Sequence, residues 1–260
     1  MTSQPSTIEL EVEVPGTAEE VWTAIATGAG ISSWYVPHVI EERAGGGAVA
    51  SFGPGDDMKV PGRVTVWDPP RHVGFDGGEG SEDGLTFDWT IEPVSGSDRC
   101  VVRLVNAGFG QGGPWDEVYE AMIGGWRMFL FNLRLHLEHF GGREAVPALP
   151  TAVWTGPRSE AWARLMGELG LNRTPMAGDR LELKSDGAPA LVGSVVSVEP
   201  TWVSLLLDEP SPGTGFIAVE GDGDDVQVSV WTYRYGDDRG VAAEADRSGW
   251  QSWLSARAPS

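Results

Sequence analysis

Two kinds of hydrophobic periodicity follow one another in the first 140 residues, and their order constrains the fold more than any other feature. The segment IELEVEV at 8–14 alternates apolar and acidic residues, which predicts a half-buried strand. Thr17 and Glu20 form a capping-box pattern that predicts a helix. Strand patterns follow at about 39–43, 47–53, 58–67, 71–76, 84–93 and 99–106. From Trp115 the period becomes helical and stays so to about 140.

The long helix expected over 115–140 carries one apolar stripe, spaced by three and four residues. Its members are Val118, Met122, Trp126, Phe129, Leu133, His136 and Phe140. A run of strands flanked by helices predicts an α+β fold, in which an antiparallel sheet curls around the long helix and encloses a cavity. Gly124 and Gly125 interrupt the helix at a cost of roughly 1 kcal/mol each relative to Ala. We therefore expect a bulky group to approach the helix closely there.

Net charge and cysteine content narrow the partners. The chain has 38 acidic and 18 basic Lys and Arg residues, a formal net charge of −20 that repels phosphate backbones and anionic membrane surfaces. We expect no nucleic-acid partner and no membrane insertion, and the absence of a signal-peptide pattern predicts a cytoplasmic protein. The single Cys100 excludes an intrachain disulfide and is expected to be a small core residue.

The second half of the chain repeats the plan of the first. GTAEEVW at 16–22 matches GPRSEAW at 156–162, GRVTVWDP at 62–69 matches GSVVSVEP at 193–200, and Gly125-Trp126 matches Gly249-Trp250. The matches fall in the same order, which favours a diverged internal duplication. We predict one domain over 1–143, a linker over 144–150, and a shorter domain over 151–260 whose last helix spans about 243–256.

Five motifs of the first half resemble the START-like (SRPBCC) superfamily, in its branch of Hsp90-ATPase-activator homologues. They are Pro15 with Val21-Trp22, Trp34-Tyr35, Gly62 to Pro70, Leu104 to Phe109, and Gly125-Trp126. The resemblance covers residues 8–140 and is faint over 151–260. It implies a helix-grip fold, a curved antiparallel sheet around a long C-terminal helix, here as two START-like domains in tandem. It also implies a cavity for apolar molecules between sheet and helix, as some members carry ligands and others are cyclases or dehydratases.

The residues expected to bind a ligand share inward positions in this plan. They are Trp34, Tyr35, Phe52, Phe75, Phe87, Trp89, Leu104, Asn106, Trp126, Phe129 and Leu133. Asn106, Tyr35 or Arg103 would orient a polar group of the ligand. No nucleophile motif is present, so catalytic residues stay unassigned. His136 and His139 lack a third ligand, and we expect neither a metal nor a cofactor.

Three functions remain open at this point. The first is binding of a small hydrophobic or aromatic molecule, lipid- or polyketide-like, in the cavity. The second is an enzyme of the polyketide cyclase or dehydratase kind, which an inward titratable group at the cavity would favour. The third is a regulatory interaction module without a ligand, which a filled core would favour, and a homodimer is compatible with each.

Overall fold

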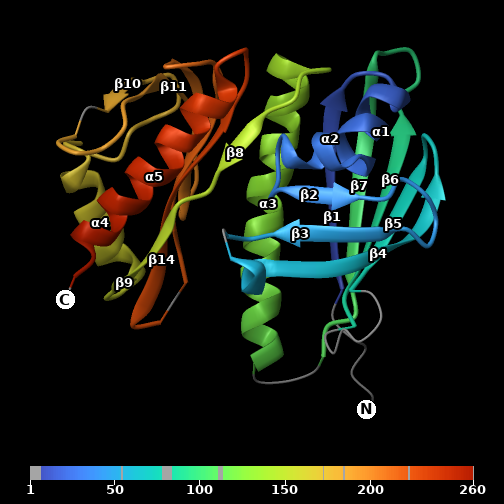
Figure 1. Cartoon of the computed structure of the whole chain (residues 1–260), viewed down its shortest axis with the longest axis horizontal. Coiled ribbons are helices and arrows are strands. Elements are labelled where there is room, and N and C mark those ends of the chain that lie inside the picture. Colours follow the sequence, from blue (N-terminus) through green and yellow to red (C-terminus); the bar gives the residue numbers. More distant parts are fainter. Residues whose placement is uncertain are drawn as a thin grey trace. The chain divides into compact units, whose positions relative to one another are not determined.

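The computed structural model describes residues 7–53, 55–77, 84–110, 114–171, 173–183, 185–221 and 223–259. The chain divides into two compact units, Met1–Glu144 and Ala145–Ser260. Among the described residues, each unit contains a seven-stranded antiparallel sheet and ends in a long helix (Figure 1). The predicted α+β class is therefore confirmed for both halves of the chain.

The N-terminal unit builds its sheet in the order β1-β7-β6-β5-β4-β3-β2. Its elements are β1 (Ile8–Pro15), α1 (Ala18–Ala26), α2 (Gly28–Ser32), β2 (His38–Ile40), β3 (Gly47–Ser51), η1 (Asp56–Met58), β4 (Lys59–Asp68), β5 (His72–Asp76), β6 (Thr86–Pro93), β7 (Arg99–Ala107) and α3 (Pro114–Phe140). Trp126 of α3 packs edge-on against Trp89 and Phe87 of β6, with ring centroids 5.5 and 5.8 Å apart. The helix thus covers the inner face of the sheet, as the helix-grip fold requires.

The alternation in β1 sets which side of that sheet is buried. Ile8 and Val14 are fully buried, and β1 pairs with β7 so that Val12 lies opposite the buried Val102. The acidic residues between them face outward, where Glu13 pairs with Arg99 and Glu9 with Arg103. Such exposed pairs contribute little to stability, so the burial of alternate apolar residues is what holds β1 in register.

The capping box predicted at the start of the first helix is confirmed. The Thr17 backbone N–H donates to the Glu20 carboxylate at 2.8 Å, and the Glu20 N–H donates to the Thr17 hydroxyl at 3.3 Å. The preceding Gly16 has φ +115°, a conformation that residues with a Cβ rarely adopt. Thr27 then caps the short helix α2, which carries the segment towards Trp34 and Tyr35.

The expectation of a close approach at the mid-helix glycines is wrong. A Cβ added to Gly124 would meet no atom within 4 Å, and one added to Gly125 would meet only the Phe129 ring at 4.0 Å. Gly124 is exposed on the helix surface. No contact with a described residue therefore offsets the helix propensity that these two positions lose.

The C-terminal unit has the strand order β10-β11-β12-β13-β14, with β14 pairing both β8 and β9. Its elements are β8 (Val146–Ala148), β9 (Thr151–Thr155), α4 (Arg158–Glu168), β10 (Arg180–Leu183), β11 (Leu191–Val198), β12 (Trp202–Glu209), β13 (Gly213–Glu220), β14 (Asp225–Arg234) and α5 (Arg239–Arg257). Two expectations need correction. The segment 144–150 contains β8 and is not a free linker, and α5 has 19 residues, longer than the helix expected over 243–256.

Irregularities shared by the two units support the predicted duplication. Gly156 has φ +115° like Gly16, and each donates its N–H to an aspartate carbonyl, that of Asp224 and Asp98 respectively. The β4–β5 pairing shifts register between Val64 and Val66, and the β11–β12 pairing shifts between Val195 and Ser197. The second pair of positions lies 131 residues after the first. The same offset separates the motifs GRVTVWDP at 62–69 and GSVVSVEP at 193–200. Two helix-grip domains therefore stand in tandem in this chain.

Candidate functional site

A pocket of about 130 Å³ lies in the N-terminal unit, between the inner face of the sheet, helix α3 and the α1–α2 segment. Seven of the predicted ligand-binding residues line it, namely Trp34, Tyr35, Phe52, Phe75, Phe87, Trp89 and Trp126. The other lining residues are Ile25, Ile31, His38, Ala48, Ala50, Val60, Pro61, Gly62, Asp76 and Gly77. The wall is therefore mostly aromatic and aliphatic, as in sites that bind small apolar molecules.

Four predicted ligand-binding residues do not reach the pocket. Leu104 and Leu133 are fully buried, and Phe129 packs edge-on against Tyr35 with ring centroids 4.4 Å apart. Asn106 is also fully buried. It accepts a hydrogen bond from the Trp126 indole N–H at 3.2 Å and donates to the Thr86 carbonyl at 3.0 Å. Its role is to fix the Trp126 ring at the pocket wall.

Tyr35 makes ring contacts with several aromatic residues of the N-terminal unit. Its ring lies 5.0 Å from Trp126 and 5.8 Å from Trp34, centroid to centroid, and it also contacts Phe52 and Phe129. No described residue forms a hydrogen bond with its hydroxyl. Burial raises the pKa of Tyr35, so the phenol stays protonated and remains a hydrogen-bond donor.

His38 is a pocket residue that the sequence did not predict. It follows Pro37 at the start of β2 and pairs with Ala50 of β3, another lining residue. Its Nδ1 lies 2.7 Å from the Val36 carbonyl, which can only accept, so Nδ1 carries the proton and Nε2 has the free lone pair. Burial lowers the pKa of His38 and favours this neutral form.

The hydrophobic pattern of β2 explains why His38 escaped prediction. Val39 is 73% exposed on the outer face, and the polar His38 lies on the same face of the strand as Ile40. If the apolar Val39 faced inward, His38 would lie on the outer face. With three residues, β2 is too short for its neighbours to correct that reading.

The pocket wall carries no cationic side chain among the described residues. Its one charged member, Asp76, pairs with Arg63 at 2.9 Å. Arg103, expected to orient a polar group, is instead on the outer face, where it pairs with Glu9. A negatively charged ligand would therefore find no counter-charge in this pocket.

Other candidate groups lie outside the pocket. Cys100 is buried, its thiol lies 3.4 Å from the Gly16 carbonyl, and burial raises its pKa, all of which suit a core residue. His136 is buried on α3. In the part of the chain that the structure describes, no three His, Cys, Asp or Glu residues gather in a metal-binding group. A larger open depression, of about 580 Å³, is walled by turn and charged residues without an aromatic ring.

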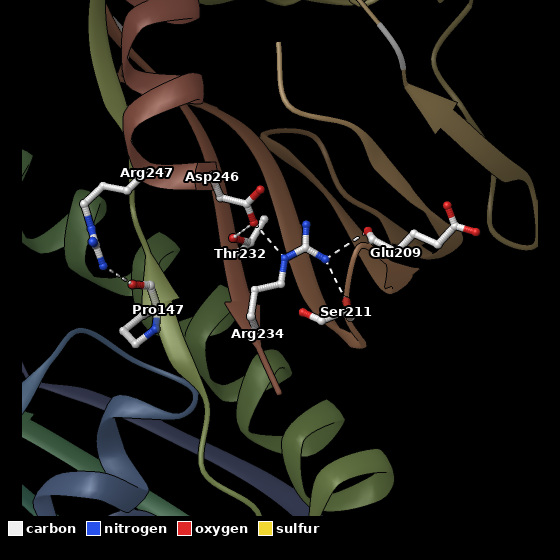
Figure 2. A network of polar contacts seen from close by, with 7 residues as sticks. All are labelled: Pro147, Glu209, Ser211, Thr232, Arg234, Asp246 and Arg247. Atoms are coloured by element: carbon white, nitrogen blue, oxygen red, sulfur yellow. Dashed lines mark hydrogen bonds and ion pairs between the residues drawn. The ribbon is translucent and has the colours of Figure 1, made fainter. Parts of the chain in front are cut away.

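The C-terminal unit places a buried polar network at the corresponding position. Strand pairing sets Thr232 opposite Gly215 of β13, as Asn106 stands opposite Phe87 of β6. Figure 2 shows the Thr232 hydroxyl donating to Asp246 of α5, at 2.7 Å. Arg234 Nε donates to the same carboxylate oxygen at 2.7 Å, and its Nη1 donates to the carbonyls of Glu209 and Ser211.

The sheet positions that carry aromatic residues in the first unit carry Gly and Ile in this one. Gly215 stands where Phe87 lines the pocket of the first unit, and by the same register Ile217 stands where Trp89 does. The side chains of Arg234 and Asp246 are 0% and 2% exposed, so this ion pair is part of the buried interior of the C-terminal unit. The aromatic pocket belongs to the N-terminal unit.

Comparison with known proteins relates the N-terminal half of the chain to one family. Residues 15–138 match the model of the family described as Activator of Hsp90 ATPase homolog 1-like protein. The uncharacterised protein Rv1546 of Mycobacterium tuberculosis is 27% identical over 119 residues, covering 42% of this chain and 82% of its own.

Two solved structures are similar over different lengths. The Aha1 dimer from Colwellia psychrerythraea is 19% identical and covers 52% of this chain and 97% of its own, with a TM-score of 0.44. The di-domain ARO/CYC protein BexL of the BE-7585A biosynthetic pathway is 16% identical and covers 96% of this chain and 92% of its own, with a TM-score of 0.47.

No helix within the described residues is both long and apolar enough to cross a membrane. The segment matched by the family model contains, or has at its edge, the motifs at Pro15, Trp34-Tyr35, Gly62–Pro70 and Gly125-Trp126. The sheet of the N-terminal unit has the strand order of the helix-grip fold. Over residues 15–138 the N-terminal unit of this chain is thus similar to the family described as Activator of Hsp90 ATPase homolog 1-like protein.

Proposed function

We propose that the N-terminal unit binds a small uncharged molecule with an aromatic or similarly flat apolar ring. The observation that carries this proposal is the pocket of about 130 Å³ with seven aromatic side chains in its wall. An apolar cavity of about 150 Å³ in another protein is large enough to take up benzene. A single ring therefore fits the pocket, and a lipid chain or a fused-ring polyketide would fit only in part.

The buried area sets the expected affinity. A single ring buries about 150 Å², which at about 25 cal/mol per Å² contributes about 4 kcal/mol. That free energy corresponds to a Kd on the order of 1 mM for a bare ring. A natural ligand would bind more tightly through contacts at the pocket mouth, where the lining residues Phe52 and Val60 are 45% and 53% exposed.

The test is ligand-detected NMR with toluene, a single ring with one methyl group. We expect wild-type protein to bind toluene and Ala50→Phe, which fills the pocket from β3, to lose that binding. Val39→Phe is the matched control, because it adds the same ring on the outer face of the same sheet edge. The proposal is wrong if wild-type protein does not bind toluene, or if Ala50→Phe and wild type bind it equally.

A second candidate function is a cyclase- or dehydratase-type reaction in the same pocket. It is favoured by one observation, namely that Tyr35 and His38, a potential proton donor and a potential base, both line the cavity. A neutral imidazole can remove a proton next to a ketone, and a protonated phenol can stabilise the resulting enolate oxygen. Exchange of the methyl protons of acetophenone with D₂O tests this. Equal rates with wild type and His38→Leu would reject it.

The third function is an interaction module without a ligand. A core without a pocket would have favoured it. The open pocket weighs against it. A homodimer stays a prediction, and sedimentation velocity of the purified chain tests it.

A further inference from the structure

The pocket wall contains a hydrogen-bond acceptor and a hydrogen-bond donor. These polar groups restrict the chemistry of the ligand more than the apolar part of the wall does. The inference developed from them rests on the proposed function, since it concerns the same pocket. Three features of the lining matter, which are a hydrogen-bond acceptor, a hydrogen-bond donor, and the sign of the local charge.

The acceptor is Nε2 of His38. The bond from Nδ1–H to the Val36 carbonyl, at 2.7 Å, fixes the tautomer and leaves the lone pair on Nε2. No hydrogen bond from a described residue reaches Nε2. A ligand that donates a hydrogen bond to this free lone pair is therefore favoured over one that does not.

The donor is the Tyr35 hydroxyl. Its ring and that of His38 lie 5.5 Å apart, centroid to centroid, and both residues line the same pocket. Contacts with Trp126 and Phe129 hold the Tyr35 ring in place. The hydroxyl can therefore donate to a ligand oxygen without a large loss of side-chain freedom.

The charge of the surroundings excludes anions. The wall offers no Lys or Arg side chain among the described residues, and the Asp76 carboxylate beside it pairs with Arg63. A carboxylate ligand would lose its hydration and gain no counter-ion. The net charge of −20 adds a long-range repulsion of the same sign.

We infer that the pocket selects uncharged ring compounds of the phenol class, whose hydroxyl donates to Nε2 of His38 and whose oxygen accepts from Tyr35. A phenol satisfies both groups at once, because a hydroxyl is donor and acceptor together. An unsubstituted hydrocarbon ring leaves both unpaired, and a benzoate brings a charge that the wall does not balance.

Three matched probes at pH 7.5 test the inference, namely toluene, 4-methylphenol and benzoate. We expect 4-methylphenol to bind wild-type protein five- to tenfold more tightly than toluene, and benzoate to show no binding at 5 mM. One net hydrogen bond is worth about 0.5–1.5 kcal/mol, which corresponds to a factor of about 2–13. Tyr35→Phe and His38→Leu should each reduce the preference to less than threefold while toluene still binds.

His72→Leu is the control variant, because His72 lies on β5 but outside the pocket, where it bonds to Asp88. It should keep the full preference for 4-methylphenol. Equal binding of toluene and 4-methylphenol by wild type, or a preference that survives both pocket variants, overturns the inference and leaves the proposed function standing. Benzoate binding as tight as that of 4-methylphenol also overturns it.

Absence of any binding by toluene and 4-methylphenol overturns the proposed function as well. If His38→Leu loses toluene binding because its pocket has collapsed, Tyr35→Phe decides, since that change removes one oxygen and keeps the ring.

Discussion

Removal of the Asp246 carboxylate should cost the C-terminal unit much of its stability. Asp246 accepts hydrogen bonds from Arg234 and Thr232, and the Arg234 side chain is fully buried. In Asp246→Ala the guanidinium keeps the carbonyls of Glu209 and Ser211 but loses its counter-charge (Figure 2). Breaking a buried ion pair from one side typically costs 3–5 kcal/mol, against about 5–15 kcal/mol for the total stability of a domain.

A double substitution that removes both charges tests whether the cost of Asp246→Ala comes from the unpaired Arg234. Arg234 Nη2 is buried without a hydrogen-bond partner in the described structure, so the network only partly compensates the desolvation of its charges. The double variant Arg234→Met/Asp246→Leu should therefore recover most of the loss. Hydrogen exchange measured over β14 reports the opening free energy of this unit separately from that of the other.

Arg247 provides the matched control for this experiment. It also lies on α5 and donates to the Pro147 carbonyl at 3.0 Å, but its side chain is 42% exposed. Arg247→Leu should change the opening free energy by less than about 1 kcal/mol. A loss below about 1 kcal/mol in Asp246→Ala, or one no larger than that of Arg247→Leu, would refute the reasoning.

Three further predictions concern the N-terminal unit. Gly124→Ala should raise the free energy of unfolding by up to about 1 kcal/mol in urea denaturation, since a Cβ there meets nothing; a loss would show an unseen contact. Burial lowers the pKa of His136 to about 4, so the unfolded chain binds more protons below pH 6.5. Wild type should then lose about 2–3 kcal/mol between pH 7 and 4.5 relative to His136→Gln, and parallel pH profiles would contradict this. Residues 1–143 alone should unfold cooperatively on heating; a broad transition without cooperativity would place the domain boundary elsewhere.

Much of the fold follows from local patterns. The alternation in IELEVEV, the Thr17–Glu20 capping box and the stripe through Trp126 each act over a few residues, and the structure contains the strand, the cap and the helix that they predict. The offset of 131 residues between the two halves likewise fits the shifted registers of β4 and β11. Such features can be predicted from the sequence because periodicity and capping depend on neighbouring residues in the chain.

Tertiary structure decided the features that depend on distant partners. The inward position of His38 is set by its pairing with Ala50, another residue of the pocket wall. Asn106 became the anchor of Trp126, and Phe129 a packing partner of Tyr35, because the long helix meets the sheet at one particular rotation. Sequence alone also could not tell the buried Arg234–Asp246 pair from the many exposed ones. Burial of a charge depends on which residues surround it in space, and that is settled only when the sheet and the helix pack together.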